Sequence, residues 1–191
     1  GRSTCKVLHT LLRKQVVVSV IDRQEIDGGF RHGEWTDLHE THNRLVNGAI
    51  HLLAAEAQLS RDPAVMHSLR AAADYIAHQI DRTKSGAWFL HDSLELSEET
   101  ISHYPFTTVA SNWQGKSRAN LLILNTHMDC TIALDRYRQV TGDNRHTELV
   151  DSARAATRAA LEARPADWLY RPLMHLIGLT LLPKKEQAAL N

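Results

Sequence analysis

Residues 47–80 read NGAIHLLAAEAQLSRDPAVMHSLRAAADYIAHQI, and this stretch decides the fold. Its first half is apolar around most of a helix, and its second half repeats apolar residues such as Val65 and Leu69 at helical spacing. Between the halves, Asp62 followed by Pro63 is typical of a helix N-cap and a first helical residue. The stretch therefore predicts two helices joined as a hairpin.

The same pattern returns at residues 121–161, with Thr141-Gly142-Asp143 as the turn between two helices. The predicted helices are, in chain order, Lys6–Gln15, Leu45–Leu59, Ala64–Ile80, Ser117–Val140, Thr147–Ala163 and Pro172–Leu182. In arrays of helix hairpins, alternate helices line the inside of an arc or ring and the others cover them. We expect the inner helices to be Leu45–Leu59, Ser117–Val140 and Pro172–Leu182, because these are apolar around most of their circumference.

The predicted fold class is therefore all-α, with about three helix hairpins that form part of an α/α toroid. We expect one toroid-like domain over residues 1–191, which could be a fragment of a larger toroid. An arc of this size leaves apolar helix flanks uncovered, so we predict a homodimer or a missing companion segment.

Charge and composition exclude several classes of function. Twenty-two basic residues balance twenty-two acidic ones, so no global field favours nucleic acid or a membrane surface as a partner. The two cysteines, Cys5 and Cys130, lack the spacing of a disulfide framework or a zinc site. No apolar run approaches the ~20 residues that span a bilayer, and the start lacks the layout of a signal peptide, so we expect a cytoplasmic location.

Residues 85–116 have no long helical period and are rich in aromatic side chains. An irregular segment of this length in a compact helical protein is usually either functional or disordered, and the many aromatic side chains favour a function. We expect it to fold over a site and to bring four side chains to a ligand: Tyr104, Trp113, Lys116 and Arg118. Alternating residues in Trp88–Leu96 also permit a short β-hairpin.

Histidines stand near the starts of all three predicted inner helices, as His42, His127 and His175. If the hairpins are parallel repeats, these starts face the same end of the arc. Imidazoles have pKa values near neutrality and suit proton transfer. The loops ahead of these helices add a second group of polar and aromatic residues, namely Arg31, His32, Glu34, Trp35, His91 and Asp92. Such side chains stack on sugar rings and bind hydroxyl or carboxylate groups.

A metal or nucleotide site is not indicated. His32, His39 and His42 lie close in sequence, but the HExxH spacing of metalloproteases is absent. Gly28-Gly29 is followed by Phe30 rather than by the spaced glycines of phosphate-binding loops. We therefore predict neither a metal nor a cofactor.

The segment 124–129 (LNTHMD), together with 133–137 (ALDRY) and 141–143 (TGD), resembles inner-helix segments of the six-hairpin carbohydrate-active enzymes. The nearest families are the N-acylglucosamine 2-epimerase superfamily and the C-terminal domains of glucuronyl C5-epimerases. The resemblance implies a carbohydrate epimerase or lyase that uses histidine acid–base chemistry. The sequence departs from the sugar 2-epimerases at Asp129, where a second histidine would be expected.

The resulting site hypothesis has two parts. The predicted acid–base residues are His127, His42 and Tyr104. The predicted residues for binding a small-molecule or oligosaccharide substrate are Arg31, His32, Glu34, Trp35, Arg44, Asn47, Trp113, Lys116, Arg118, Asn125, Asp129 and His175. We expect His127 to line a polar cavity, because a polar cluster at the start of an apolar buried helix is costly unless it finds partners or a wet site.

Two alternatives stay open. A glycoside hydrolase of the six-hairpin type needs two facing carboxylates, for which Glu34, Asp92 and Asp129 are the candidates. A noncatalytic helical-repeat scaffold would instead bind a glycan or a protein partner on its concave face.

Overall fold

The computed structural model describes residues 2–31, 41–102, 110–112, 114–164, 167–168 and 171–181. Its elements are α1 (Arg2–Asp22), α2 (Asn43–Ser60), α3 (Pro63–His78), β1 (Ile80–Thr83), β2 (Gly86–Phe89), the 3₁₀ helix η1 (Ser93–Leu96), α4 (Glu98–Ile101), α5 (Leu124–Thr141), α6 (Thr147–Glu162) and α7 (Arg171–Leu181). The described chain is thus mostly α-helical, as the sequence predicts, and its two strands form one antiparallel hairpin.

The chain divides into two compact units, residues 1–156 and residues 157–191. The first holds α1 to α5, the β-hairpin and most of α6, and the second holds α7. The single domain expected over residues 1–191 stays a prediction. Within the described ranges, no helix combines the length and apolar character needed to cross a bilayer.

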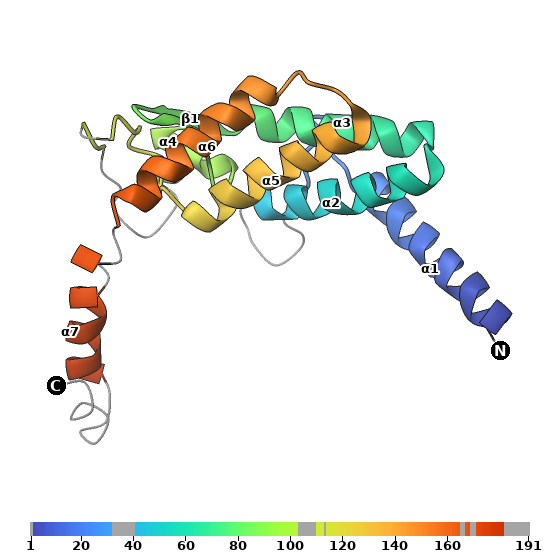
Figure 1. Cartoon of the computed structure of the whole chain (residues 1–191), viewed down its shortest axis with the longest axis horizontal. Coiled ribbons are helices and arrows are strands. Elements are labelled where there is room, and N and C mark those ends of the chain that lie inside the picture. The colour runs from blue at the N-terminus through green and yellow to red at the C-terminus, as the bar shows by residue number, and fades with distance from the viewer. Residues whose placement is uncertain are drawn as a thin grey trace. The chain divides into compact units, whose positions relative to one another are not determined.

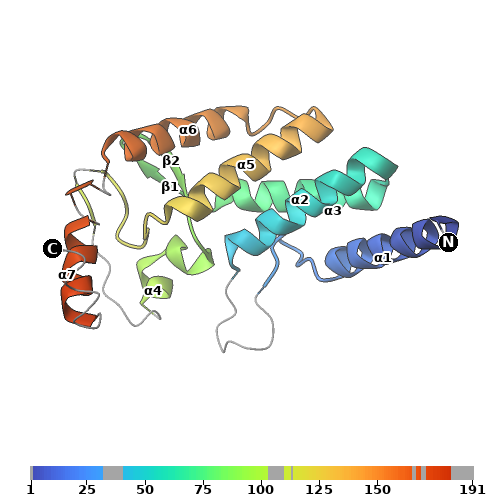
Figure 2. The ribbon, with the colours of Figure 1, turned by 60° about the horizontal axis from the view of Figure 1, so that its bottom comes forward.

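The core of the first unit lies where α2, α3 and α5 pack together. Its fully buried side chains include Ile50 and Leu53 of α2, Leu69 of α3 and Leu134 of α5. Figures 1 and 2 show that α2 and α5 run in the same direction. Helix α3, which lies between them in sequence, runs in the opposite direction. The first predicted hairpin is therefore present as α2 and α3, and α5 lies beside α2 as its parallel neighbour. The second predicted pair of helices is present as α5 and α6, in that order along the chain.

Local signals explain the boundaries of the first hairpin. The Asp62 side chain accepts a hydrogen bond from the Ala64 N–H at 2.8 Å, and Pro63 is the first residue of α3, as predicted. Helix α2 ends just before Arg61, which takes a left-handed conformation with φ of 51°. The α2–α3 connection is therefore encoded by its own few residues.

Several predicted boundaries are wrong. Helix α1 runs from Arg2 to Asp22, beyond both ends of the predicted Lys6–Gln15. Helix α5 begins at Leu124 rather than Ser117, because Leu122 has a left-handed φ of 55° and the Asn120 Oδ1 accepts the Leu122 N–H at 2.7 Å. The helix predicted to run to Ile80 stops at His78, because Ile80 pairs with Phe89 at the start of the β-hairpin.

Glycine makes the β-hairpin possible. Gly86 has a φ of 139°, and a Cβ atom there would lie 2.2 Å from the Ser152 carbonyl oxygen of α6. The adjacent Ala87 N–H donates to the Ser152 Oγ at 2.9 Å. The hairpin is thus held against α6 by a close backbone approach, and it delivers Trp88, Phe89 and the loop that follows to the start of α5.

Candidate functional site

The N-terminal ends of α2 and α5 lie side by side and join through polar contacts. The Asn47 side-chain amide donates to the Asp129 Oδ2 at 3.1 Å and contacts the Cys130 Sγ at 3.2 Å. The His51 Nε2 lies 3.7 Å from the Asp129 Oδ1. The structure therefore brings together two residues predicted for substrate binding, Asn47 and Asp129.

A pair of histidines lies at the same helix ends. The rings of His42 and His91 meet edge to face, with centroids 4.0 Å apart and planes at 79°. His42 precedes α2 and forms a β-bridge with Asp92, which fixes the loop after β2 beside the helix start. The His91 Nδ1 is 2.7 Å from the Thr126 Oγ1 of α5. Three chain segments thus meet at these two imidazoles, which we call the His42–His91 pair.

The surroundings of the pair favour a neutral imidazole at His91. Burial lowers the pKa of His91, the Asp92 carboxylate opposes this shift, and the Arg44 guanidinium adds to it. The ring is half-buried, so it keeps some access to solvent. A neutral, partly accessible imidazole hydrogen-bonded to a hydroxyl is suited to accept a proton.

The Asp92 side chain is part of the framework. It is fully buried, and its Oδ1 accepts the Leu94 N–H at 2.8 Å as the N-cap of η1. The Ser93 N–H donates to the Thr41 carbonyl, and the Thr41 N–H donates back to the Ser93 Oγ at 2.8 Å. The loop that carries His91 is therefore bound to Thr41, the residue before His42, by one backbone hydrogen bond and one hydrogen bond to a side chain.

His127 lies in the core rather than at the wall of a solvent-filled cavity. It has no exposed surface, and its ring stacks on Trp88 with centroids 4.1 Å apart. Its Nδ1 accepts the Phe89 N–H at 3.0 Å, so its Nε2 carries the proton and donates to the Ala153 carbonyl at 3.2 Å. Burial lowers the pKa of His127 to about 4. Its catalytic role stays a prediction that these contacts do not favour, because both ring nitrogens bind backbone groups.

The other predicted binding residues are spread over the first unit. Arg31 lies 3.5 Å from Asp27 and 3.9 Å from Glu25, on the turn after α1. Arg118 lies 3.6 Å from Glu98 of α4. Both guanidinium groups face local carboxylates in this structure.

Lys116 and Asn125 make local contacts to the backbone. The Lys116 ammonium donates to the Asn120 carbonyl at 2.7 Å and to the Ser117 carbonyl at 3.0 Å. The Asn125 Oδ1 accepts the Thr126 N–H at 2.8 Å. Lys116 thus supports the segment ahead of α5, and Asn125 lies exposed beside Thr126.

Several predicted residues cannot be placed at this site. His32, Glu34, Trp35, Tyr104 and Trp113 lie outside the described residues. His175 is an exposed residue of α7 in the second unit. Whether these side chains reach the His42–His91 pair therefore stays a prediction.

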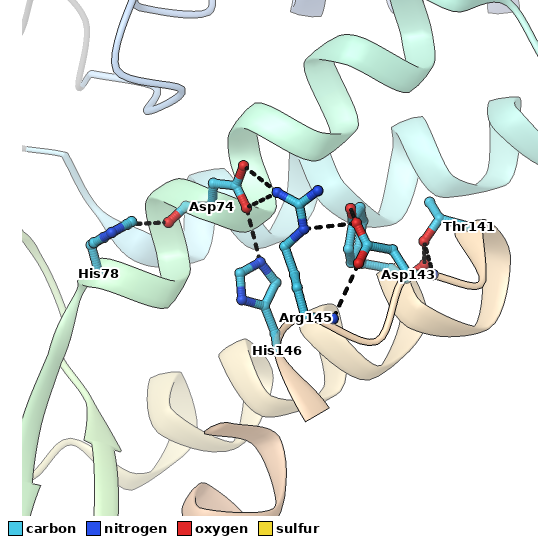
Figure 3. A network of polar contacts seen from close by, with 7 residues as sticks. Asp74, His78, Thr141, Asp143, Arg145 and His146 are labelled. Atoms are coloured by element: carbon cyan, nitrogen blue, oxygen red, sulfur yellow. Dashed lines mark hydrogen bonds and ion pairs between the residues drawn. The ribbon is translucent and has the colours of Figure 1, made fainter. Parts of the chain in front are cut away.

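A polar network ties the far end of α5 to α3 (Figure 3). The buried Tyr137 donates its hydroxyl to the Asp143 Oδ2 at 2.6 Å, across the predicted Thr141-Gly142-Asp143 turn. Beyond the turn, the Arg145 guanidinium and the His146 Nε2 reach Asp74 of α3 at 3.2 Å and 2.9 Å. These contacts join the turn after α5 to helix α3, at the opposite end of α5 from the His42–His91 pair.

Sequence reasoning missed two residues of the histidine site. The sequence pattern places His91 in the loop ahead of the second predicted inner helix but not in the acid–base set, and it gives no role to Glu95, which accepts the His91 N–H. The available signal was the dipeptide His91-Asp92 directly after an apolar strand-like run. Among the described residues, no group of three histidine, cysteine or carboxylate side chains is arranged to hold a metal ion.

A shallow groove lies elsewhere, between α1 and the α2–α3 connection, and is lined by Val17, Ile21 and Val65 among others. None of the site residues predicted from the sequence lines this groove. Comparison of the chain with protein-family models, with curated proteins and with solved structures finds no match.

Proposed function

We propose that the chain forms part of an α/α toroid and that the His42–His91 pair is the acid–base centre of a carbohydrate-active enzyme. One observation carries the proposal: two partly accessible imidazoles meet where the starts of two parallel neighbouring helices converge. The sugar substrate is supported by the resemblance of residues 124–143 to inner helices of the six-hairpin enzymes.

The substrate class that suits this site is a uronate, a sugar that carries a carboxylate. The exposed Arg44 lies in the first turn of α2, close enough to influence the pKa of His91. The N-terminal ends of α2 and α5 both carry partial positive charge. A carboxylate held there would acidify the adjacent C–H bond of the sugar once its own charge is neutralised.

The proton transfer then follows from the contacts of His91. With its Nδ1–H donated to Thr126, the Nε2 lone pair takes the proton from the carbon beside the carboxylate. The electron pair of that C–H bond forms a carbon–carbon double bond, and the bond to the neighbouring glycosidic oxygen breaks. A protonated His42 supplies the proton that the departing oxygen needs. Solvent then returns both imidazoles to their starting states.

Of the two reactions that the resemblance implies, this geometry favours the lyase. An epimerase that uses two bases needs them on opposite faces of the sugar, and rings 4.0 Å apart leave no room for a substrate between them. An epimerase would need a second acid on the far face, for which Tyr104 is the sequence-predicted candidate.

The experiment is a reaction screen of the full chain with uronate-containing oligosaccharides in D₂O, followed by NMR. A lyase creates an unsaturated uronate, whereas an epimerase introduces deuterium at the reacting carbon without forming a double bond. His91→Ala and His42→Ala should each lower turnover by ~100-fold or more. The matched control is His67→Ala, which removes an exposed histidine of α3.

If the unaltered chain neither eliminates nor exchanges deuterium with any uronate, the enzyme proposal is overturned. Equal turnover losses in His67→Ala and His91→Ala would also defeat the assignment, because only one of these residues belongs to the pair.

The hydrolase alternative has weaker support. Asp92 is fully buried as an N-cap, and Asp129 accepts a hydrogen bond from Asn47. Neither carboxylate faces another across an open site in the described part of the chain, and Glu34 lies outside it.

The scaffold alternative is supported by a different observation, on α1. Four apolar side chains of this helix, Val7, Leu8, Leu11 and Leu12, are each more than half exposed, at 58%, 56%, 60% and 58%. An apolar stripe of this kind favours association with a second copy or with a protein partner. Binding of a glycan without turnover, together with loss of a dimer on Leu8→Glu, would support this alternative over the enzyme.

A further inference from the structure

Glu95 occupies a buried position beside the His42–His91 pair. Only 2% of its surface is exposed, and its two carboxylate oxygens bind different chain segments. The Oε1 accepts the His91 N–H at 2.8 Å, and the Oε2 accepts the Leu121 N–H at 2.7 Å. One carboxylate therefore joins the loop after β2 to the segment that leads into α5.

These two segments carry the two partners of the histidine contact. His91 lies on the first, and the second leads to Thr126, whose hydroxyl lies 2.7 Å from the His91 Nδ1. The second segment has no regular secondary structure, and it contains the left-handed Leu122. Its position thus depends on side-chain acceptors, of which Glu95 is one and Asn120 another.

The groups around Glu95 shift its pKa in opposite directions. Burial is the main influence and raises the pKa of Glu95 to about 7, and the nearby Asp92 carboxylate acts in the same direction. The two backbone N–H groups of His91 and Leu121 oppose it. The Lys116 ammonium also interacts with Glu95 as an opposite charge, and the His91 imidazole lies on the residue whose N–H Glu95 binds.

We propose that Glu95 is a proton-sensitive positioning residue. When the Glu95 carboxylate is ionised it keeps His91 in contact with Thr126, and when Glu95 is protonated this contact weakens. The functional part of this inference rests on the proposed role of the His42–His91 pair. An ionised carboxylate accepts two N–H groups fully, whereas a protonated one has a hydroxyl facing one of the two donors. The His91–Thr126 contact therefore tightens as the pH rises through neutrality.

The test is an NMR titration of the full chain between pH 5 and pH 9, with labelled glutamate carboxyl and histidine ring atoms. We expect the His91 ring signals to show, besides their own titration, a second inflection at the midpoint of the Glu95 carboxyl signal. Glu95→Gln should abolish this inflection and lower turnover about tenfold with little change in KM. Glu99→Gln, which alters an exposed glutamate four residues later, should change neither.

The unaltered chain provides a test even if Glu95→Gln does not fold. A Glu95 carboxyl that titrates without moving the His91 signals overturns the inference. If the shared inflection is present but no uronate reacts, the positioning role stands and the proposed reaction falls. If a uronate reacts and Glu95→Gln leaves both the His91 signals and turnover unchanged, the proposed function stands and the positioning role falls.

Discussion

The contacts of His127 assign it a part in holding three elements together. Its ring nitrogens bind the Phe89 N–H of β2 and the Ala153 carbonyl of α6, and Trp88 stacks on its face. The sequence correctly predicts a helix at this residue. It could not show that two backbone groups, 38 and 26 positions away, take both ring nitrogens.

The first prediction follows from these contacts. His127→Ala should lower the free energy of unfolding by about 3 kcal/mol at pH 7, because it leaves a cavity and two buried backbone groups without partners. Denaturant unfolding measures this loss. His51→Ala, which alters a partly exposed histidine of α2, is the control and should have a small effect.

The same loss should depend on pH. The folded-state pKa of His127 is lowered from 6.5 to about 4, so between these values the unfolded chain binds a proton that the folded chain does not. The stability that His127 contributes therefore falls as the pH drops from about 6.5 to about 4. The destabilisation by His127→Ala should shrink over this range. If the destabilisation by His127→Ala instead grows toward pH 4, the His127 imidazole is not neutral and buried in the folded chain.

Glu95 gives a pH dependence of opposite sign. Its folded-state pKa is raised from 4.5 to about 7, so the folded chain binds the extra proton within this window. The contribution of Glu95 to stability is fully present below pH 4.5 and declines as the pH rises toward 7. As the pH rises through this window, the unaltered chain should therefore lose unfolding free energy relative to Glu95→Gln, by roughly 3 kcal/mol in total. A difference that is constant from pH 4.5 to pH 7 would exclude the raised pKa.

At the scale of the elements, local signals in the sequence predict the hairpins well. Asp62 and Pro63 start α3 as expected, and the Thr141-Gly142-Asp143 turn follows α5. The β-hairpin was placed too late, because its position depends on the approach of Gly86 to Ser152, a contact with a helix 66 residues further along the chain. The start of α5 was placed too early for a similar reason, since Glu95 and Asn120 hold the segment before it.

The turn after α5 offers a prediction at this scale. The Tyr137 hydroxyl is the main reason that the pKa of Asp143 is lowered, with burial acting against it and Arg145 adding to the lowering. Tyr137→Phe should cost about 1 kcal/mol of unfolding free energy at neutral pH, and the pKa of Asp143 should rise.

A lowered carboxyl pKa contributes stability above its ordinary value, and this contribution is lost as the pH falls. The cost of Tyr137→Phe should therefore decrease below the ordinary Asp143 pKa of 3.8. Equal costs at pH 7 and pH 3 would show that the hydrogen bond to Asp143 is not the source of the effect.

At the scale of the whole molecule, the exposed apolar side chains of α1 make association the expected behaviour. We predict a concentration-dependent dimer in sedimentation experiments, and Leu8→Glu together with Leu12→Glu should shift it to a monomer without loss of helical signal. A chain that stays monomeric at high concentration would remove the argument for a second copy on α1, and with it the main support for the scaffold alternative.

The central claim is that the His42–His91 pair at the starts of α2 and α5 is a site for an acidic sugar. The most direct measurement is an NMR titration of the histidine ring signals of the full chain with a uronate oligosaccharide. We expect the His42 and His91 signals to shift together and to saturate with one binding constant, while those of buried His127 and exposed His67 stay in place. If the uronate saturates the protein and leaves the His42 and His91 signals unmoved, the site is elsewhere and the claim is wrong.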